Sequence, residues 1–330
     1  MRKKNTSLNS HNITAKDTYQ TKTKMHFSKD HPMSLKHIVT LRKFLSTCGT
    51  WPTEFFNPKS RRKLLTALLI LISCTNQSAE LHYISKKIHV LPFFDLGDLY
   101  MTFFLSFLTV VRTILPYFHS YGVLIRDFIM EFHLMHFRSN GEHYELLFNK
   151  INKFSHVYTY LIVGNMILGP IFFNIPPFYN NLMNGAFTNN RVENYTLEFS
   201  VYFSYPWYDE EDHFILSTII NCYFSYNCSL FLCLIDLLMG LMVFQIIGHI
   251  KTLVQDLRSL PRPKNPNVME VLCRKTNVHT NLLVYSYDTN ENEFIRGKII
   301  EFVQHHRIIV RLVRTSYLRQ RMVADLYFVC

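Results

Sequence analysis

Long stretches without charged side chains limit what this chain can fold into more than any other feature of its sequence. Residues 154–190 contain no Asp, Glu, Lys or Arg, residues 214–250 contain only Asp236, and residues 99–125 contain only Arg112. Each stretch exceeds the roughly 20 apolar residues that a helix needs to cross a bilayer. Helices in the core of a soluble protein are usually shorter and keep one charged face. The pattern therefore predicts membrane-spanning helices.

These stretches and the residues around them predict an all-α membrane protein. We expect a transmembrane helix bundle with four full spans and a truncated fifth. The full spans are expected at Leu64–Ala79, Leu99–Phe118, Phe154–Tyr179 and Phe214–Ile250.

The fourth span is too long for a bilayer and is expected to continue as a helix through Lys251–Leu260. Pro261-Arg262-Pro263 should end it, because proline interrupts a helix. A polar loop is expected next. A helical pattern then resumes over Phe294–Cys330 and turns apolar from Ala324, as expected for a fifth span cut off where it enters the membrane.

The charge distribution predicts the orientation of the bundle. Residues 1–63 carry 14 Lys/Arg and 3 Asp/Glu, which accounts for the whole net charge of +11. Because these residues precede apolar spans, we attribute the charge to a cytoplasmic amino terminus and expect no nucleic-acid partner. Residues 1–63 are thus interpreted as a cytoplasmic segment, with residues 1–34 disordered, and residues 64–330 as the bundle.

The segment 182–213 carries one basic and six acidic residues, so it is expected outside the cell. It contains the sequon Asn194-Tyr195-Thr196, which makes Asn194 a candidate glycosylation site.

No pattern in the sequence predicts an enzyme. The 7 cysteines show no CxxC spacing, and we find no nucleotide-binding glycine pattern, paired intramembrane carboxylates or nucleophile motif. We therefore expect no catalytic residue, no cofactor and no metal site.

Several short motifs, in this order, resemble the insect odorant receptor family over residues 40–330. They are Cys48-Gly49-Thr50-Trp51-Pro52, Asp95-Leu96-Gly97-Asp98, Tyr205-Pro206-Trp207, Leu234-Ile235-Asp236-Leu237-Leu238, Gln245-Ile246-Ile247-Gly248-His249 and Gln304-His305-His306-Arg307-Ile308-Ile309.

The resemblance implies a seven-helix subunit with a cytoplasmic amino terminus that requires no G protein. Such subunits assemble with an odorant co-receptor, as a tetramer, into an odorant-gated cation channel in the plasma membrane of sensory neurons. This chain stops at Cys330, where the family's fifth helix crosses, so helices six and seven are missing and a C-terminal truncation is expected. The alternatives are a gustatory receptor, a secondary transporter and a non-conducting truncated product.

The resemblance also implies an odorant cavity in the outer half of the bundle, apolar with one or two polar groups. The residues selected for this cavity are Met101, Phe104, Leu105, Met166, Ile167, Pro170, Ile171, Thr218, Ile219, Cys222 and Tyr223. For any single one of them, a role in packing is favoured over a contact with the ligand.

Three polar side chains stand out from the apolar pattern. Asp236 and Arg112 are each expected near the cytoplasmic end of their helix, where they reach water. His305, beside several arginines, is expected at a solvated start of the last helix.

Overall fold

The structure is a computed structural model that describes residues 31–56, 62–188, 192, 195–210, 212–263, 265–273 and 278–329. The predicted disorder of the amino terminus, except for residues 31–34, and the predicted glycosylation of Asn194 fall outside the described residues. Cys330 also falls outside them.

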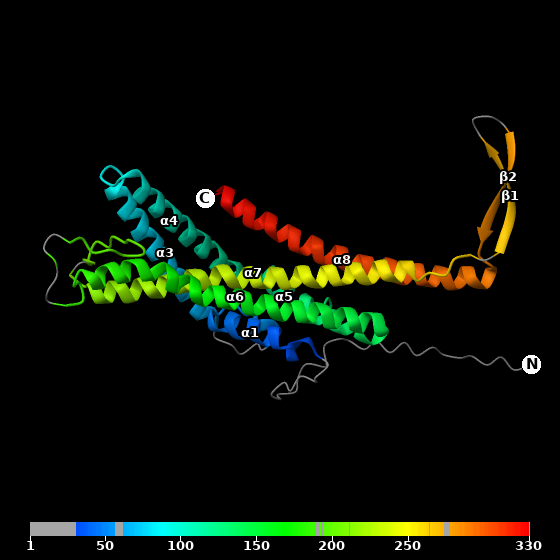
Figure 1. The fold of residues 1–330 in the computed structure, drawn as a ribbon, viewed down its shortest axis with the longest axis horizontal. Coiled ribbons are helices and arrows are strands. Elements are labelled where there is room, and N and C mark those ends of the chain that lie inside the picture. The colour runs from blue at the N-terminus through cyan, green and yellow to red at the C-terminus, as the bar shows by residue number, and fades with distance from the viewer. Residues whose placement is uncertain are drawn as a thin grey trace, which may run out of the picture.

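Two long helices, side by side, form the axis of the molecule (Figure 1): α6 (Glu142–Met183) and α7 (Phe214–Arg258). Their 42 and 45 residues correspond to about 63 and about 68 Å, roughly twice the thickness of a bilayer core. The continuation of the fourth span as a helix past Ile250 is confirmed, and α7 ends at Arg258, just before Pro261.

A second pair of helices packs beside the half of this axis that contains Met183 and Phe214. The pair consists of α3 (Arg62–Lys87) and α4 (Phe93–Ile114). The first expected span lies within α3 and most of the second within α4. Among the described residues, three helices are long and apolar enough to cross a membrane: Phe93–Tyr117, Glu142–Met183 and Phe214–Arg258. The predicted helical membrane bundle is confirmed in these terms, and α3, which contains the first expected span, is not one of the three helices.

Short elements connect the pairs at the other end. They are η1 (Pro32–Ser34), α1 (Lys36–Thr47), α2 (Thr53–Phe56), η2 (Leu115–Tyr117), α5 (His119–Met130) and η3 (Leu134–Asn140).

The expectation of a polar loop after α7 is wrong, because a β-hairpin occupies that segment. Strand β1 (Asn265–Cys273) pairs antiparallel with β2 (Val278–Ser286), with Asn265 opposite Ser286 and Cys273 opposite Val278. Both strands contain two valines, and β2 also contains Thr280 and Tyr285; valine, threonine and tyrosine favour a pleated backbone. The predicted last helix is confirmed as α8 (Thr289–Val329), which begins beside the end of α7 and diverges from α7 toward its own C-terminal end (Figure 1).

The main hydrophobic core lies where α1, α5 and α7 meet. The aliphatic side chains at its centre are Ile38, Leu41 and Leu45 of α1, Ile125 and Ile129 of α5, and Leu234, Leu237, Leu238 and Leu241 of α7. Helix α1 is amphipathic, and its apolar face is the one buried here. The segment before the first span is therefore packed into the bundle along one face.

Candidate ligand-binding cavity

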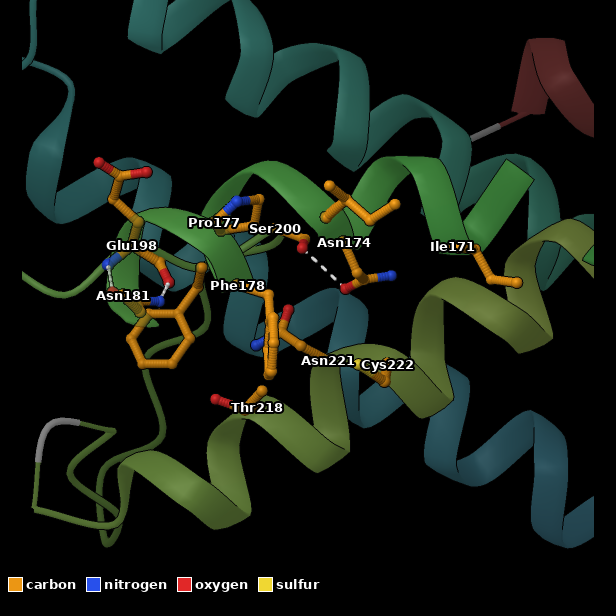
Figure 2. Close-up of a pocket in the computed structure, with 12 residues that line it drawn as sticks. Ile171, Asn174, Pro177, Phe178, Asn181, Glu198, Ser200, Thr218, Asn221 and Cys222 are labelled. Carbon is orange, nitrogen blue, oxygen red and sulfur yellow. Dashed lines mark hydrogen bonds between the residues drawn. The ribbon is translucent and has the colours of Figure 1, made fainter. Parts of the chain in front are cut away.

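A cavity of about 220 Å³ lies between α6 and α7 near the end of the axis that carries segment 195–210 (Figure 2). Side chains of both helices and of this segment, here called the outer loop, line it. They are Ile171, Asn174, Ile175, Pro177, Phe178, Asn181, Glu198, Phe199, Ser200, Thr218, Asn221 and Cys222. Six of the twelve lining residues are apolar or cysteine, and six carry a carboxamide, a hydroxyl or a carboxylate, but the surface that they expose to the cavity is mainly apolar. A mainly apolar surface with a few polar groups is usual for a small-molecule site.

Proline in α6 helps to join the two helices beside the cavity. Pro170 has no N–H, so the carbonyl of Met166, one turn earlier, lacks its helical partner. The hydroxyl of Ser229 on α7 donates to that carbonyl oxygen at 3.1 Å. A backbone group freed by proline thus becomes an interhelical hydrogen bond.

Three carboxamides on the helices hold the outer loop over the cavity. Asn181 donates through Nδ2 to the Glu198 carbonyl at 2.5 Å, and its Oδ1 accepts from the Glu198 N–H at 3.0 Å. Asn174 Oδ1 accepts from the Ser200 hydroxyl at 2.7 Å, drawn dashed in Figure 2, and Asn221 Oδ1 accepts from the backbone N–H of residue 201 at 3.0 Å. The loop is therefore bonded to both α6 and α7.

A second set of contacts holds the far side of the outer loop. Glu210 Oε1 accepts from the Phe203 N–H at 2.9 Å, and the Tyr205 hydroxyl donates to Asn76 of α3 at 2.9 Å. Burial raises the pKa of Glu210 to about 7, opposed by the hydrogen bond from Phe203, while nearby Asp209 raises it further. The neutral carboxyl is thus the form that the folded loop favours.

The cavity carries little charge. As far as the structure describes the chain, no Lys, Arg or His lines it, and Glu198 is its one charged lining residue. Glu198 Oε2 accepts from Asn180 at 2.7 Å, and Figure 2 shows the carboxylate turned away from Thr218 and Cys222. Within the described ranges, no group of three or more His, Cys, Asp or Glu side chains is arranged to hold a metal ion.

The structure brings together three of the eleven residues selected from the sequence. Ile171, Thr218 and Cys222 line the cavity. Met166 and Pro170 are buried in helix packing. The remaining six are at least partly exposed and do not line it: Met101, Phe104, Leu105, Ile167, Ile219 and Tyr223.

Sequence reasoning missed the three asparagines that hold the loop. Asn174 and Asn181 fall in the stretch without charges, and Asn221 falls in the next one. A carboxamide in an apolar span is costly unless it is hydrogen-bonded, so these positions carried a usable signal. The loop residues Glu198, Phe199 and Ser200 carried none, because their approach to the helices depends on the path of the loop.

Arg112 and Asp236 were treated separately, but the structure pairs them. Arg112 Nη1 lies 3.1 Å from Asp236 Oδ1 and donates to the Leu232 carbonyl at 2.5 Å. The two charges therefore join α4 to α7.

The expectation of a solvated His305 is wrong. This side chain is buried, its Nε2 lies 2.9 Å from Nδ1 of His249, and its ring stacks on Phe137 at 5.2 Å between centroids. The His249 Nε2 in turn lies 2.6 Å from the Phe132 carbonyl oxygen. The pair joins α8 to α7, which is why it is buried despite the arginines nearby.

Comparison with known proteins identifies the family. The family profile described as 7tm odorant receptor matches residues 94–319, which is more than half of the chain. No curated protein matches the chain. The matched region includes α6, α7, the outer loop and the cavity, so the chain belongs to the 7tm odorant receptor family.

Proposed function

We propose that this odorant receptor is an odorant-specific subunit, which binds a small volatile apolar ligand and forms an odorant-gated cation channel with a co-receptor. The observation that carries the proposal is the mainly apolar cavity between α6 and α7 beneath the outer loop. Its size and composition suit a small ligand with few polar atoms.

A ligand in the cavity could change the positions of α6, α7 and the outer loop relative to one another. A molecule bound there would contact α6, α7 and the outer loop together. A ligand shifts a conformational equilibrium only by as much as it binds one state better than the other. We therefore infer that the open state is the one whose cavity fits the odorant more closely.

A row of apolar side chains on α7 supports assembly with another subunit. Val243, Ile247, Ile250, Val254 and Leu257 recur at alternating spacings of four and three residues, and each is between 39% and 49% exposed. This spacing is what one helix presents to a second helix. The row begins roughly 43 Å along α7 from Phe214, beyond the reach of one bilayer. We propose that a helix of a neighbouring co-receptor subunit covers it.

The charge distribution supports the proposed orientation in the plasma membrane of a sensory neuron. The basic amino-terminal segment and the far end of α7 would face the cytoplasm, and the acidic outer loop would face outside. Glycosylation at Asn194 would then be possible.

The test is to express the chain with and without an odorant co-receptor and to record currents evoked by a mixture of volatile compounds. We expect inward current only when both are present. Ile171→Trp should fill the cavity and raise the half-maximal ligand concentration at least about tenfold. Ile167→Trp is the matched control, because Ile167 lies one turn away on α6, is 47% exposed and does not line the cavity.

Three outcomes would contradict the proposal. Equal responses of the Ile171→Trp and Ile167→Trp variants would place the ligand elsewhere. Uptake of a solute by cells that lack the co-receptor would favour the secondary transporter, and the absence of any current would favour a non-conducting product.

A further inference from the structure

Most polar groups around the cavity already form hydrogen bonds within the protein. The donors and acceptors that remain determine which ligand fits. Thr218 donates its hydroxyl hydrogen to the Phe214 carbonyl at 2.9 Å. A hydroxyl has one hydrogen and two acceptor lone pairs, so Thr218 Oγ1 can still accept but has no further hydrogen to donate.

The carboxamides around the cavity still have N–H groups to donate. Nδ2 of Asn174 donates to the Pro170 carbonyl at 2.7 Å, and Nδ2 of Asn221 donates to the Ser217 carbonyl at 3.2 Å. Each amide nitrogen carries two hydrogens, so one N–H of each remains beyond these bonds. Thr218 and Asn221 both line the cavity and are three residues apart on α7, on one face of the helix, so an acceptor and an N–H donor are neighbours there.

One ligand group satisfies both partners. An alcohol oxygen accepts from an amide N–H while its own hydrogen is donated to Thr218 Oγ1. A ketone can only accept, and a hydrocarbon can do neither. A polar group left unpaired in an apolar site is costly, so an alcohol has the advantage over both.

The charge and the size of the cavity restrict the class of ligand further. A ligand carboxylate would find no cation to pair with among the described lining residues. A ligand ammonium group would gain little from Glu198, because that carboxylate is turned away from Thr218 and Cys222 and already accepts a hydrogen bond from Asn180. An apolar cavity of about 150 Å³ accommodates benzene, so by proportion about 220 Å³ corresponds to about nine non-hydrogen atoms.

We propose that the cavity selects an uncharged aliphatic alcohol of about this size, and that Thr218 is the residue that distinguishes it from a ketone or hydrocarbon. The inference rests on the proposed function, because it assumes that the cavity is the odorant site.

The experiment measures binding and not current. The chain in lipid nanodiscs is equilibrated at neutral pH with octanol, octanone, nonane, heptanoate or octylammonium, each of about nine non-hydrogen atoms. The bound fraction is measured by gas chromatography or mass spectrometry. Octanol is expected to bind tightest, with the two ions at least about tenfold weaker.

Two variants isolate the Thr218 hydroxyl. Thr218→Val keeps the side-chain shape and should weaken octanol binding about tenfold, while octanone and nonane change less than about twofold. Thr218→Ser keeps the hydroxyl and should retain the preference for octanol.

Each outcome decides the inference. Equal loss of octanol and nonane in Thr218→Val, or tight binding of either ion, overturns it. If none of the five compounds binds while the volatile mixture evokes current, the ligand class is wrong and the proposed function stands. If octanol binds as expected but no current is evoked, the ligand class stands and the proposed channel function fails.

Discussion

Residues 214–241 of α7, with the part of α6 beside them, have two ends that are built differently. At the inner end, midway along α7, Leu234, Leu237, Leu238 and Leu241 are each at most 2% exposed and pack into one large apolar cluster. At the outer end the same helices enclose a cavity, and asparagine side chains bond them to the outer loop.

One helix pair can therefore be rigid at its inner end and adaptable at its outer end. Close packing of apolar side chains tolerates little change in shape. Individual hydrogen bonds to a loop contribute about 1 kcal/mol each and can be exchanged more readily. A ligand site is therefore better placed at the outer end, and a fixed contact with α1, α5 and α8 at the inner end.

The largest effect is expected from Leu237→Ala at the inner end. The side chain is fully buried, so its loss leaves a cavity and should lower the free energy of unfolding by about 2–5 kcal/mol. Leu216→Ala is the control, because Leu216 lies on the outer part of α7 and is 50% exposed. Denaturant titrations in detergent micelles, followed by circular dichroism, measure both. Equal losses would remove the contrast between the two ends.

A smaller and more local effect is expected from Asn181→Ala at the outer end. The change removes both bonds to the Glu198 backbone and leaves its N–H unpaired, at a cost of about 1–3 kcal/mol. Amide hydrogen exchange should accelerate in the outer loop but not in the inner core. Asn184→Ala is the control, since its carboxamide donates to Asn180 on the same helix. Faster exchange throughout the core would show that the two ends are one cooperative unit.

The stability of the outer loop should depend on pH through Glu210. Its pKa is raised from 4.5 to about 7 by burial, so the folded state binds a proton more tightly than the unfolded state. The contribution to stability is therefore complete at low pH and is lost as the pH rises through about 7.

The melting temperature of the natural chain, taken relative to that of Glu210→Gln, should fall between about pH 5 and about pH 8. The difference between the two chains is the quantity to measure, because buried histidines such as His305, whose pKa is lowered by burial, change stability in the opposite direction in both. Asp212→Asn, an exposed neighbour, is the control and should behave as the natural chain does. A difference that rises with pH over this range would show that Glu210 is charged in the folded loop.

The sequence alone predicted the long helices because their signal is local. Runs without charges mark α4, α6 and α7, and proline marks the end of α7. The hairpin was missed because β1 and β2 mix polar and apolar residues without a regular alternation, so their pairing depends on contact across a turn.

The candidate site was predictable only in part. Ile171, Thr218 and Cys222 were selected and do line the cavity, but residues on α4 were selected with equal reason and do not. Hydrophobic spacing shows that a helix has apolar positions, and it does not show which way each helix is rotated toward its neighbours. Outer-loop residues such as Phe199 enter the cavity through contacts between segments far apart in the chain.

The smallest effect is expected at the Arg112–Asp236 pair, where Asp236 lies between Leu234 and Leu237 of the inner end. Because the Asp236 side chain is 56% exposed in the isolated chain, the pair should contribute only about 0–1 kcal/mol there. Arg112→Leu should cost more than Asp236→Asn, since it also removes the hydrogen bond to Leu232. A double-mutant cycle measures the coupling, and the exposed Arg138–Glu145 pair is the reference. Coupling that exceeds the reference and persists at high salt would mean that lipid or a second subunit covers the pair, because screening weakens only pairs that water reaches. Coupling equal to the reference would leave the apolar cluster as what fixes the inner end.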